Sequence, residues 1–198
     1  VAHSTKGGVF MLRIEDTDDK REVPGAVEKI IKYLGGFGLG FDEGATADGE
    51  IGEYGPYRQR ARAKIYHIVA KKLLLEGRAY PCFCTAEELE EIHKMQEESK
   101  ENFGYYGKWA RHRDMDIDEA IKRITDGESF VLRFRSEGNP EKKIKFKDSI
   151  KGELEIPEND QDFVLLKSDG IPTYHFAHVV DDHFMRTTDV IRGEEWLS

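Results

Sequence analysis

The first half of the chain alternates apolar stretches with glycine and proline. A short apolar run over 9–14 follows a glycine pair and predicts a buried strand. Apolar residues then recur at helical spacing from Pro24, and we expect Gly35 and Gly36 to end that helix. A second amphipathic pattern predicts a helix over 61–76.

The pattern changes near Pro81, where charged residues become dense. Thr85 and Glu88 have the spacing of a capping box, which predicts a charged helix reaching about Glu101. A further helix is predicted over 117–124.

Two stretches then alternate strictly between apolar and basic residues. They cover 130–135 and 143–148, with a turn at 138–140 between them. Such alternation predicts strands with an apolar face inward and a basic face outward. The outward basic residues would be Arg133, Arg135, Lys143, Lys145 and Lys147.

The last part of the chain returns to short apolar elements. We predict a strand over 163–166, a turn at 170–172, a helix over 174–184 and a final strand over 189–192. The simplest organisation is two α/β pieces around an inserted module, and a single α+β domain is the alternative. The pieces would be residues 1–80 and 161–198, and the module residues 81–160.

Composition narrows the class of protein. The 198 residues are 38% hydrophobic and 35% charged, which is typical of a globular domain with a charged surface. The apolar runs are too short to span a membrane, and the net charge of −9 argues against a general nucleic-acid coat protein. Two cysteines are too few for a disulfide framework, so we expect a reducing cytoplasm. The chain lacks an initiator methionine, which predicts a fragment.

The first candidate site is the carboxylate run after the first strand, Glu15-Asp16-Thr17-Asp18. Ligands bind at the carboxyl ends of strands in open α/β sheets, and carboxylates there can hold an ammonium group or a metal. The plainer interpretation is a solvated loop with a salt bridge from Arg13.

The second candidate lies on the helix over 174–184. His175, His178 and Asp182 share one helical face, as do Tyr174, His178 and Asp181. This spacing suits a divalent metal, so a metal hydrolase is one hypothesis, and a polar helix beside a cleft is the other.

Single residues elsewhere suggest further contacts. Arg192 at a strand end suits a bidentate grip on a carboxylate, and Trp196 could stack on a base or belong to the core. Cys82 and Cys84 are a weak metal signal with His93 and His112 as further candidate ligands. Phosphate-binding and dinucleotide-binding glycine motifs are absent from the sequence.

Six stretches of the sequence form a distinctive set: Leu12–Asp18, Gly55–Arg60, Val164–Gly170, Pro172–Ala177, Val179–His183 and Val190–Ser198. Together they closely resemble the bacterial-type glutamyl-tRNA synthetases of class I. The resemblance implies a Rossmann-like catalytic domain with an inserted α+β module that binds the tRNA acceptor stem. It also implies two steps, ATP-dependent formation of glutamyl-adenylate and transfer of the glutamyl group to the 3′ end of glutamate tRNA.

The resemblance also implies roles for individual residues. L-Glutamate, ATP with Mg²⁺ and glutamate tRNA would be the partners, the protein would be a monomer, and some family members carry zinc in the inserted module. The implied residues are Glu15, Tyr174, His178 and Arg192 for glutamate, Glu195 and Trp196 for ATP, Asp18, Arg133, Arg135 and Lys145 for tRNA, and Cys82, Cys84 and His112 for zinc.

The chain departs from the family in lacking both nucleotide-binding motifs, of the HIGH and KMSKS types. The chain alone is therefore expected not to form glutamyl-adenylate. A tRNA-modifying glutamyl transferase and a glutaminyl-tRNA synthetase are related alternatives. A non-catalytic tRNA-binding module is an alternative of another class, in which the basic strands matter and Glu15 does not.

Overall fold

A computed structural model describes residues 7–18, 23–191 and 193 of the chain. These residues fall into two compact units, which we call the first and the second unit. Over the part of the chain that is described, each helix is too short or too polar to cross a bilayer. Of the described residues, the first unit contains 7–18, 23–69 and 171–188, and the second contains 70–170, 189–191 and 193.

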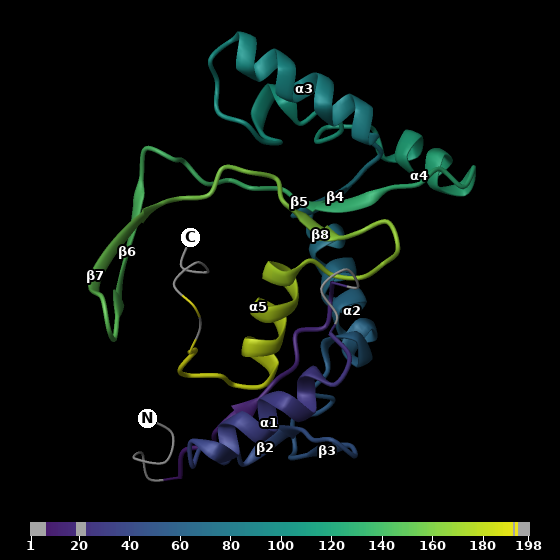
Figure 1. Ribbon diagram of the computed structural model, residues 1–198. Helices are drawn as coiled ribbons and strands as arrows, with labels where there is room; N and C mark the ends of the chain where they lie inside the picture. Colours follow the sequence, from purple (N-terminus) through teal and green to yellow (C-terminus); the bar gives the residue numbers. More distant parts are fainter. Residues whose placement is uncertain (1–6, 19–22, 192, 194–198) are drawn as a thin grey trace. The chain divides into compact units, whose positions relative to one another are not determined.

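A small three-stranded sheet lies in the first unit (Figure 1). Strand β1 (Met11–Leu12) pairs in parallel with β2 (Glu43–Ala45), and β3 (Glu50–Ile51) pairs with β2 in the antiparallel sense. Gly44 has a φ of 147°, and a Cβ atom there would collide with the backbone of Leu12. Glycine is therefore required where β1 and β2 approach each other.

Helices complete the first unit. Helix α1 covers Ala26–Gly36, and α5 covers Tyr174–Phe184. A 3₁₀ turn over Gln59–Arg62 leads into α2 (Ala63–Leu75), whose residues up to Val69 belong to this unit. A small apolar cluster lies beside the sheet, and its buried members are Ala45, Tyr57 and Met185.

The helices of the first unit largely confirm the predictions. Helix α5 has the predicted bounds, and the helix predicted over 61–76 is α2 with its preceding 3₁₀ turn. Helix α1 runs through Gly35 and Gly36 and ends there, so these glycines belong to its last turn.

The strands predicted near the two ends of the chain are only partly confirmed. The strand predicted over 9–14 is reduced to Met11–Leu12, with Ile14 bridging to Arg58. The strand predicted over 189–192 is wrong for residues 189–191, which are in no strand. Arg192 lies outside the described residues.

The second unit contains an antiparallel three-stranded sheet. Strand β5 (Val131–Phe134) lies in the middle, between β4 (Ala79–Cys82) and β8 (Val164–Leu166). Helix α3 (Ala86–Glu98) follows β4, and α4 (Ile117–Thr125) precedes β5.

The start of helix α3 confirms the predicted capping box. The hydroxyl of Thr85 accepts from the backbone N–H of Glu88 at 3.2 Å, and the carboxylate of Glu88 accepts from the backbone N–H of Thr85 at 2.9 Å. Both bonds satisfy N–H groups that the first helical turn leaves unpaired.

The two alternating stretches do not pair with each other. Strand β6 (Lys143–Asp148) forms a hairpin with β7 (Gly152–Pro157), a strand that the sequence pattern had not indicated (Figure 1). Lys143, Lys145 and Lys147 are exposed on this hairpin, as predicted.

The prediction of an outward basic face is wrong for Arg133. Its side chain is buried, its Nη1 donates to the carbonyl oxygen of Asp162 at 2.8 Å, and its guanidinium lies 4.0 Å from the ring centre of Tyr105. The reason is that β5 is a central strand whose second face is covered by residues from outside the sheet.

A fully buried carboxylate, Asp162, connects the segments of the second unit. It accepts from the hydroxyl of Tyr80 at 2.6 Å, from Nη1 of Arg113 at 2.5 Å and from the backbone N–H of Ser136 at 2.8 Å. Its own backbone N–H donates to the carbonyl of Tyr105 at 2.8 Å. A buried charge with this many donors is satisfied, and removing it would leave its partners unpaired.

We predict that Asp162→Asn destabilises the chain by about 3 kcal/mol, because the substitution breaks a buried ion pair. Asp114→Asn is the matched control, since Asp114 pairs with Arg135 at 2.8 Å on an exposed site, and it should cost less than about 1 kcal/mol. Urea unfolding of both variants measures the difference, and equal losses would contradict the central role of Asp162.

Candidate functional site

The first unit is organised around a second buried carboxylate, Asp181 of helix α5, which has no exposed surface. Arg62 donates from Nε to one carboxylate oxygen at 2.6 Å. The hydroxyl of Tyr66 and the side-chain amide of Gln59 donate to the other oxygen, at 2.8 and 3.1 Å. These bonds hold α5 against the 3₁₀ turn and the start of α2.

The donors to Asp181 are themselves held in place. Nη1 of Arg62 also donates to the carbonyl oxygens of Tyr54 and Pro56, at 3.1 and 3.0 Å. Burial, together with the nearby charge of Asp181, raises the pKa of Tyr66 well above its ordinary value. The hydroxyl therefore stays protonated and remains a donor.

Arg13, directly after β1, faces three carboxylates. Its Nη1 donates to Asp182 at 2.7 Å, its Nη2 donates to Glu15 at 3.3 Å, and its Nε lies 3.7 Å from Asp181. Burial acts to lower the pKa of Arg13, but the hydrogen bond with Asp182 and the charges of the three carboxylates raise it overall. The guanidinium is a permanent positive charge among these acids.

The contacts of Arg13 join the two candidate sites of the first unit. Glu15 reaches Asp182 through Arg13, and Nδ1 of His178 lies 3.8 Å from the second oxygen of Asp182. The rings of His178 and Tyr174 stack with their centres 5.4 Å apart. Three of the residues implied for glutamate therefore lie in one continuous set of contacts, which we call the carboxylate site.

The other residues that the resemblance implies for glutamate, ATP and tRNA in the first and last parts of the chain lie at the edge of the described residues or outside them. Asp18 is exposed just beyond the strand-end loop. Arg192, Glu195 and Trp196 lie outside the described residues, so their places beside the carboxylate site stay predictions.

The metal hydrolase hypothesis gains no support. Among the described residues, the histidines, cysteines and acids that converge within ligand distance are those of one group in the second unit, and His175, His178 and Asp182 do not form such a group. The rings of His175 and His178 are 6.3 Å apart.

That one converging group is Cys82, Cys84 and His112, whose ligand atoms lie within 4.8 Å of one another. Sγ of Cys84 is 3.4 Å from Nδ1 of His112. His93, the other histidine considered from the sequence, instead packs against the ring of Phe103.

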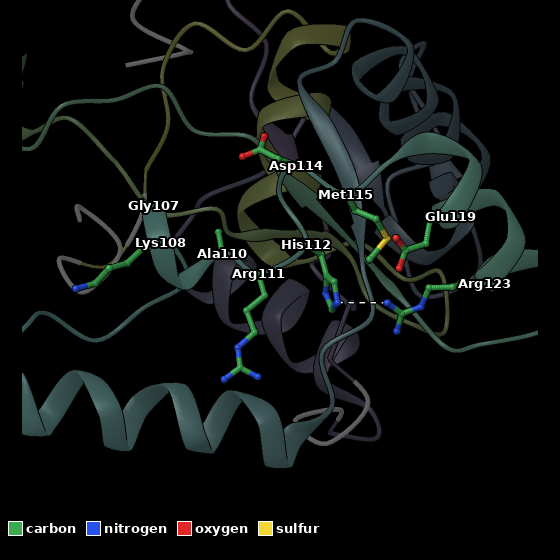
Figure 2. A pocket seen from close by; sticks show the side chains of 9 residues that line it. All are labelled: Gly107, Lys108, Ala110, Arg111, His112, Asp114, Met115, Glu119 and Arg123. Carbon is green, nitrogen blue, oxygen red and sulfur yellow. Dashed lines mark hydrogen bonds between the residues drawn. The ribbon is translucent and has the colours of Figure 1, made fainter.

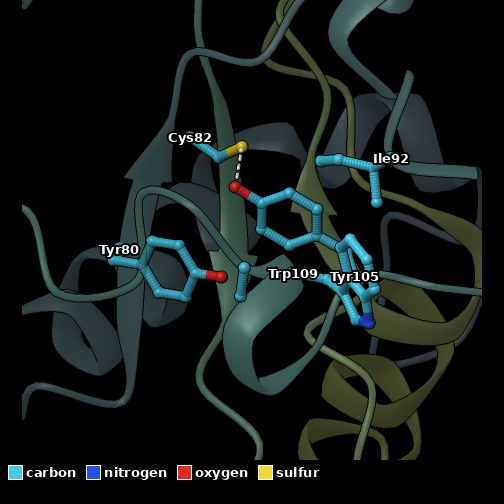
Figure 3. Close-up of a cluster of buried hydrophobic side chains, with 6 residues drawn as sticks. Tyr80, Cys82, Ile92, Tyr105 and Trp109 are labelled. Atoms are coloured by element: carbon cyan, nitrogen blue, oxygen red, sulfur yellow. Dashed lines mark hydrogen bonds between the residues drawn. The ribbon is translucent and has the colours of Figure 1, made fainter. Parts of the chain in front are cut away.

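The hydroxyl of Tyr105 completes this cysteine cluster. It lies 3.3 Å from the sulfur of Cys82 (Figure 3). It also lies 3.3 Å from the sulfur of Cys84 and accepts from the backbone N–H of His112 at 3.2 Å. Ligands of a tetrahedral zinc ion are separated by roughly 3.3–3.8 Å, which follows from metal–ligand distances of about 2.0–2.3 Å. The donor set therefore fits zinc, although Nδ1 of His112 also accepts from the N–H of Phe83 at 3.2 Å.

The two thiols of the cluster differ in acidity. A hydrogen bond from Cys84 lowers the pKa of Cys82 to about 4 against the opposing effect of burial, and the same bond raises the pKa of Cys84. A thiolate is the form of cysteine that ligates metals.

A shallow surface hollow lies beside His112 (Figure 2). Nη1 of Arg123 lies 3.4 Å from Nε2 of His112 at this hollow, and its guanidinium covers the ring of Phe83 and pairs with Glu128. His112 is therefore the member of the cluster that faces a surface hollow. The hollow is lined by Gly107, Lys108, Ala110, Arg111, His112, Asp114, Met115, Glu119 and Arg123.

The remaining basic residues implied for tRNA are paired with acids. Arg135 bonds to the exposed Asp114 at 2.8 Å and to the carbonyl of Arg113. Lys145 pairs with Glu155 at 2.8 Å across the hairpin. An anionic partner would have to compete with these exposed pairs, which are individually weak.

Several residues of these sites were not indicated by the sequence pattern. The roles of Arg62 and Tyr66 as partners of Asp181 were missed, although the two residues lie four positions apart within the helix predicted over 61–76, which is a usable signal. Nothing in the spacing of Tyr105 singles it out as a neighbour of the two cysteines.

Comparison with known proteins shows the family. The model for the catalytic domain of class I tRNA synthetases (E and Q) matches residues 2–198. The chain belongs to this family. The predicted fold class is confirmed, since the structure is mixed α/β and its neighbours among solved structures are glutamate–tRNA ligases.

Relatives in this family are highly similar over the whole chain. The glutamate–tRNA ligase of Acetivibrio thermocellus is 61% identical over all of this chain, and that of Clostridium beijerinckii is 57% identical over 98% of it. A crystal structure of a glutamate tRNA ligase from Elizabethkingia meningosepticum in complex with its amino acid is 40% identical, with a TM-score of 0.82 over 96% of this chain. The chain spans 36%, 35% and 38% of these proteins, respectively.

We predict that Arg62→Met destabilises the chain by about 3–5 kcal/mol, because it leaves Asp181 charged and buried without its closest cation. Arg60→Met is the control, since Arg60 is exposed, and it should cost less than about 1 kcal/mol. Thermal and urea unfolding provide the measurement. A loss for Arg62→Met as small as that of the control would contradict the importance of this buried pair.

Proposed function

We propose that the chain is the central part of the catalytic region of a glutamate–tRNA ligase, which we call the parent enzyme. The parent enzyme would activate L-glutamate with ATP to glutamyl-adenylate and transfer the glutamyl group to the 3′ end of glutamate tRNA. The observation that carries this proposal is the carboxylate site, where Glu15, His178 and Tyr174 meet through Arg13 and Asp182. The similarity to named glutamate–tRNA ligases supports it.

In this proposal the carboxylate site binds the amino acid. Glu15 holds the substrate ammonium group, and Arg192 holds the side-chain carboxylate with help from Tyr174 and His178. The guanidinium of an arginine can donate two parallel hydrogen bonds to the two oxygens of a carboxylate. The amide of glutamine has only one acceptor oxygen and no negative charge, so it binds there less well. The site would thus favour glutamate over glutamine.

In the proposed formation of glutamyl-adenylate, these residues form no covalent bond with the substrates. Attack of the glutamate carboxylate on the α-phosphate of ATP depends mainly on positioning and on stabilising charge. Glu195 and Trp196 would contact the adenosine of ATP, whose phosphates would carry Mg²⁺. Because the chain contains neither of the family's two nucleotide-binding motifs, we propose that it is inactive without the rest of the parent enzyme.

The second unit would meet the tRNA acceptor end. Arg135 and Lys145 are the proposed contacts there, and Asp18 is the proposed contact of the first unit. Arg133 is buried against Asp162 and Tyr105, which supports a role in holding the sheet together rather than one at the tRNA surface. A tRNA-binding module without catalysis is the competing function, and glutamate binding distinguishes the two.

We also propose that Cys82, Cys84 and His112 hold a zinc ion beside the hydroxyl of Tyr105. The three ligands come from β4 and from the loops that follow it, so the ion would have a structural role. The ion would join the end of β4 to the loop before α4.

We predict that Glu15→Gln in the parent enzyme raises the KM for glutamate at least about tenfold, because an amide cannot neutralise the substrate ammonium. Glu28→Gln, an exposed change on α1, is the control and should leave the KM unchanged. Aminoacylation of glutamate tRNA at varied glutamate concentration measures both. A parent enzyme that binds tRNA but never charges it would support the non-catalytic module instead.

We predict that the purified chain carries close to one equivalent of zinc and that Cys84→Ser removes most of it, because a hydroxyl is a poor zinc ligand. His93→Gln should retain the metal, since His93 lies against Phe103 instead. Elemental analysis after extensive dialysis measures the content. Equal zinc in both variants, or none in the unsubstituted chain, would argue against this site.

A further inference from the structure

We propose that Arg13 is a positioning residue that holds Glu15, the proposed partner of the substrate ammonium group, at a set separation from Asp182. This inference rests on the proposed glutamate-binding function. It adds two residues, Arg13 and Asp182, to those implied for the amino acid.

The first support is the division of the guanidinium among three acids. Nη1 of Arg13 bonds to Oδ1 of Asp182, Nη2 bonds to Oε1 of Glu15, and Nε faces Oδ2 of Asp181. Because a guanidinium is planar and rigid, its two hydrogen bonds to Asp182 and Glu15 constrain its orientation, and the nearby charge of Asp181 attracts it. The positions of Glu15 and Asp182 are then linked through one rigid group.

The second support is that one of the three acids is immobile. Asp181 is completely buried and receives hydrogen bonds from Arg62, Tyr66 and Gln59. Arg13 is itself mostly buried, with 11% of its side chain exposed. Arg13 is therefore held beside the rigid, buried Asp181, and it in turn restrains the partly exposed side chains of Glu15 and Asp182.

The third support is the way that Asp182 uses its two oxygens. Oδ1 accepts from Arg13, while Oδ2 lies 3.8 Å from Nδ1 of His178, whose ring stacks on Tyr174. Asp182 therefore connects the proposed ammonium end of the substrate, at Glu15, with the proposed carboxylate end, at Tyr174. A shift of Arg13 would disturb both ends.

A lysine at position 13 would keep the positive charge but could not make the directed hydrogen bonds of the planar guanidinium. An ammonium group is a point charge at the end of a flexible chain and cannot direct three separate nitrogens at three acids. It would balance the charge of the site without setting the separation of Glu15 and Asp182. Arg13→Lys therefore separates positioning from simple charge balance.

The experiment compares Arg13→Lys with Arg58→Lys in the parent enzyme. Arg58 lies in the same unit, is half-buried and donates to the carbonyl of Thr46 at 3.3 Å, so it is a matched control. Arg13→Lys should raise the KM for glutamate about tenfold, with kcat and the KM for ATP changed less than about threefold, because binding of the ammonium is what loosens. Arg58→Lys should change none of these.

A double-mutant cycle tests whether Arg13 acts through Glu15. In a Glu15→Gln background, Arg13→Lys should raise the KM for glutamate less than about twofold, since the partner it positions is already altered. If Arg13→Lys does not fold, as judged by its melting curve, Asp182→Asn replaces it in the same cycle, with the same outcome expected.

Three results would overturn the inference. They are an unchanged glutamate KM in folded Arg13→Lys, a loss confined to melting temperature, and full additivity with Glu15→Gln. Failure of the proposed function looks different, because the unsubstituted parent enzyme would then not charge tRNA with glutamate at all.

Discussion

The buried carboxylate of Asp181 is the constraint on which the first unit depends. A charge without exposed surface is tolerated only when donors surround it, and Arg62, Tyr66 and Gln59 supply them from segments more than a hundred residues away in sequence. Meeting this requirement brings helix α5 against the 3₁₀ turn and α2. It also places Arg13 where it can reach Asp182 and Glu15.

The second unit also contains a buried carboxylate that needs hydrogen-bond donors, Asp162. Its donors come from β4, from the loop before α4 and from the segment after β5, and its backbone N–H reaches the carbonyl of Tyr105. Tyr105 in turn places its hydroxyl between Cys82 and Cys84. The geometry proposed for zinc is thus connected to the polar interior of the same unit, so the metal and the buried acid would reinforce one set of segments.

The buried carboxylates of Asp162 and Asp181 stabilise the fold, whereas the accessible carboxylates of the carboxylate site are the ones proposed to bind a ligand. Asp162 and Asp181 are buried and each accepts three hydrogen bonds, whereas Glu15 and Asp182 of the first unit remain partly exposed. Rigid support for a few accessible groups is what a reaction based on positioning requires. The carboxylate site therefore agrees with the membership of the class I tRNA synthetase family.

The sequence by itself determined the helices, the capping box and the family. Helix α5 and the capping box of α3 were predicted correctly because helix periodicity and capping act over three or four residues. Only the tertiary structure decided that Arg133 points inward, since Tyr105 and the segment at Asp162 cover its face of the sheet. It alone also decided the partners of Asp181, because contacts such as that with Gln59, 122 residues away, leave no periodic trace in the chain.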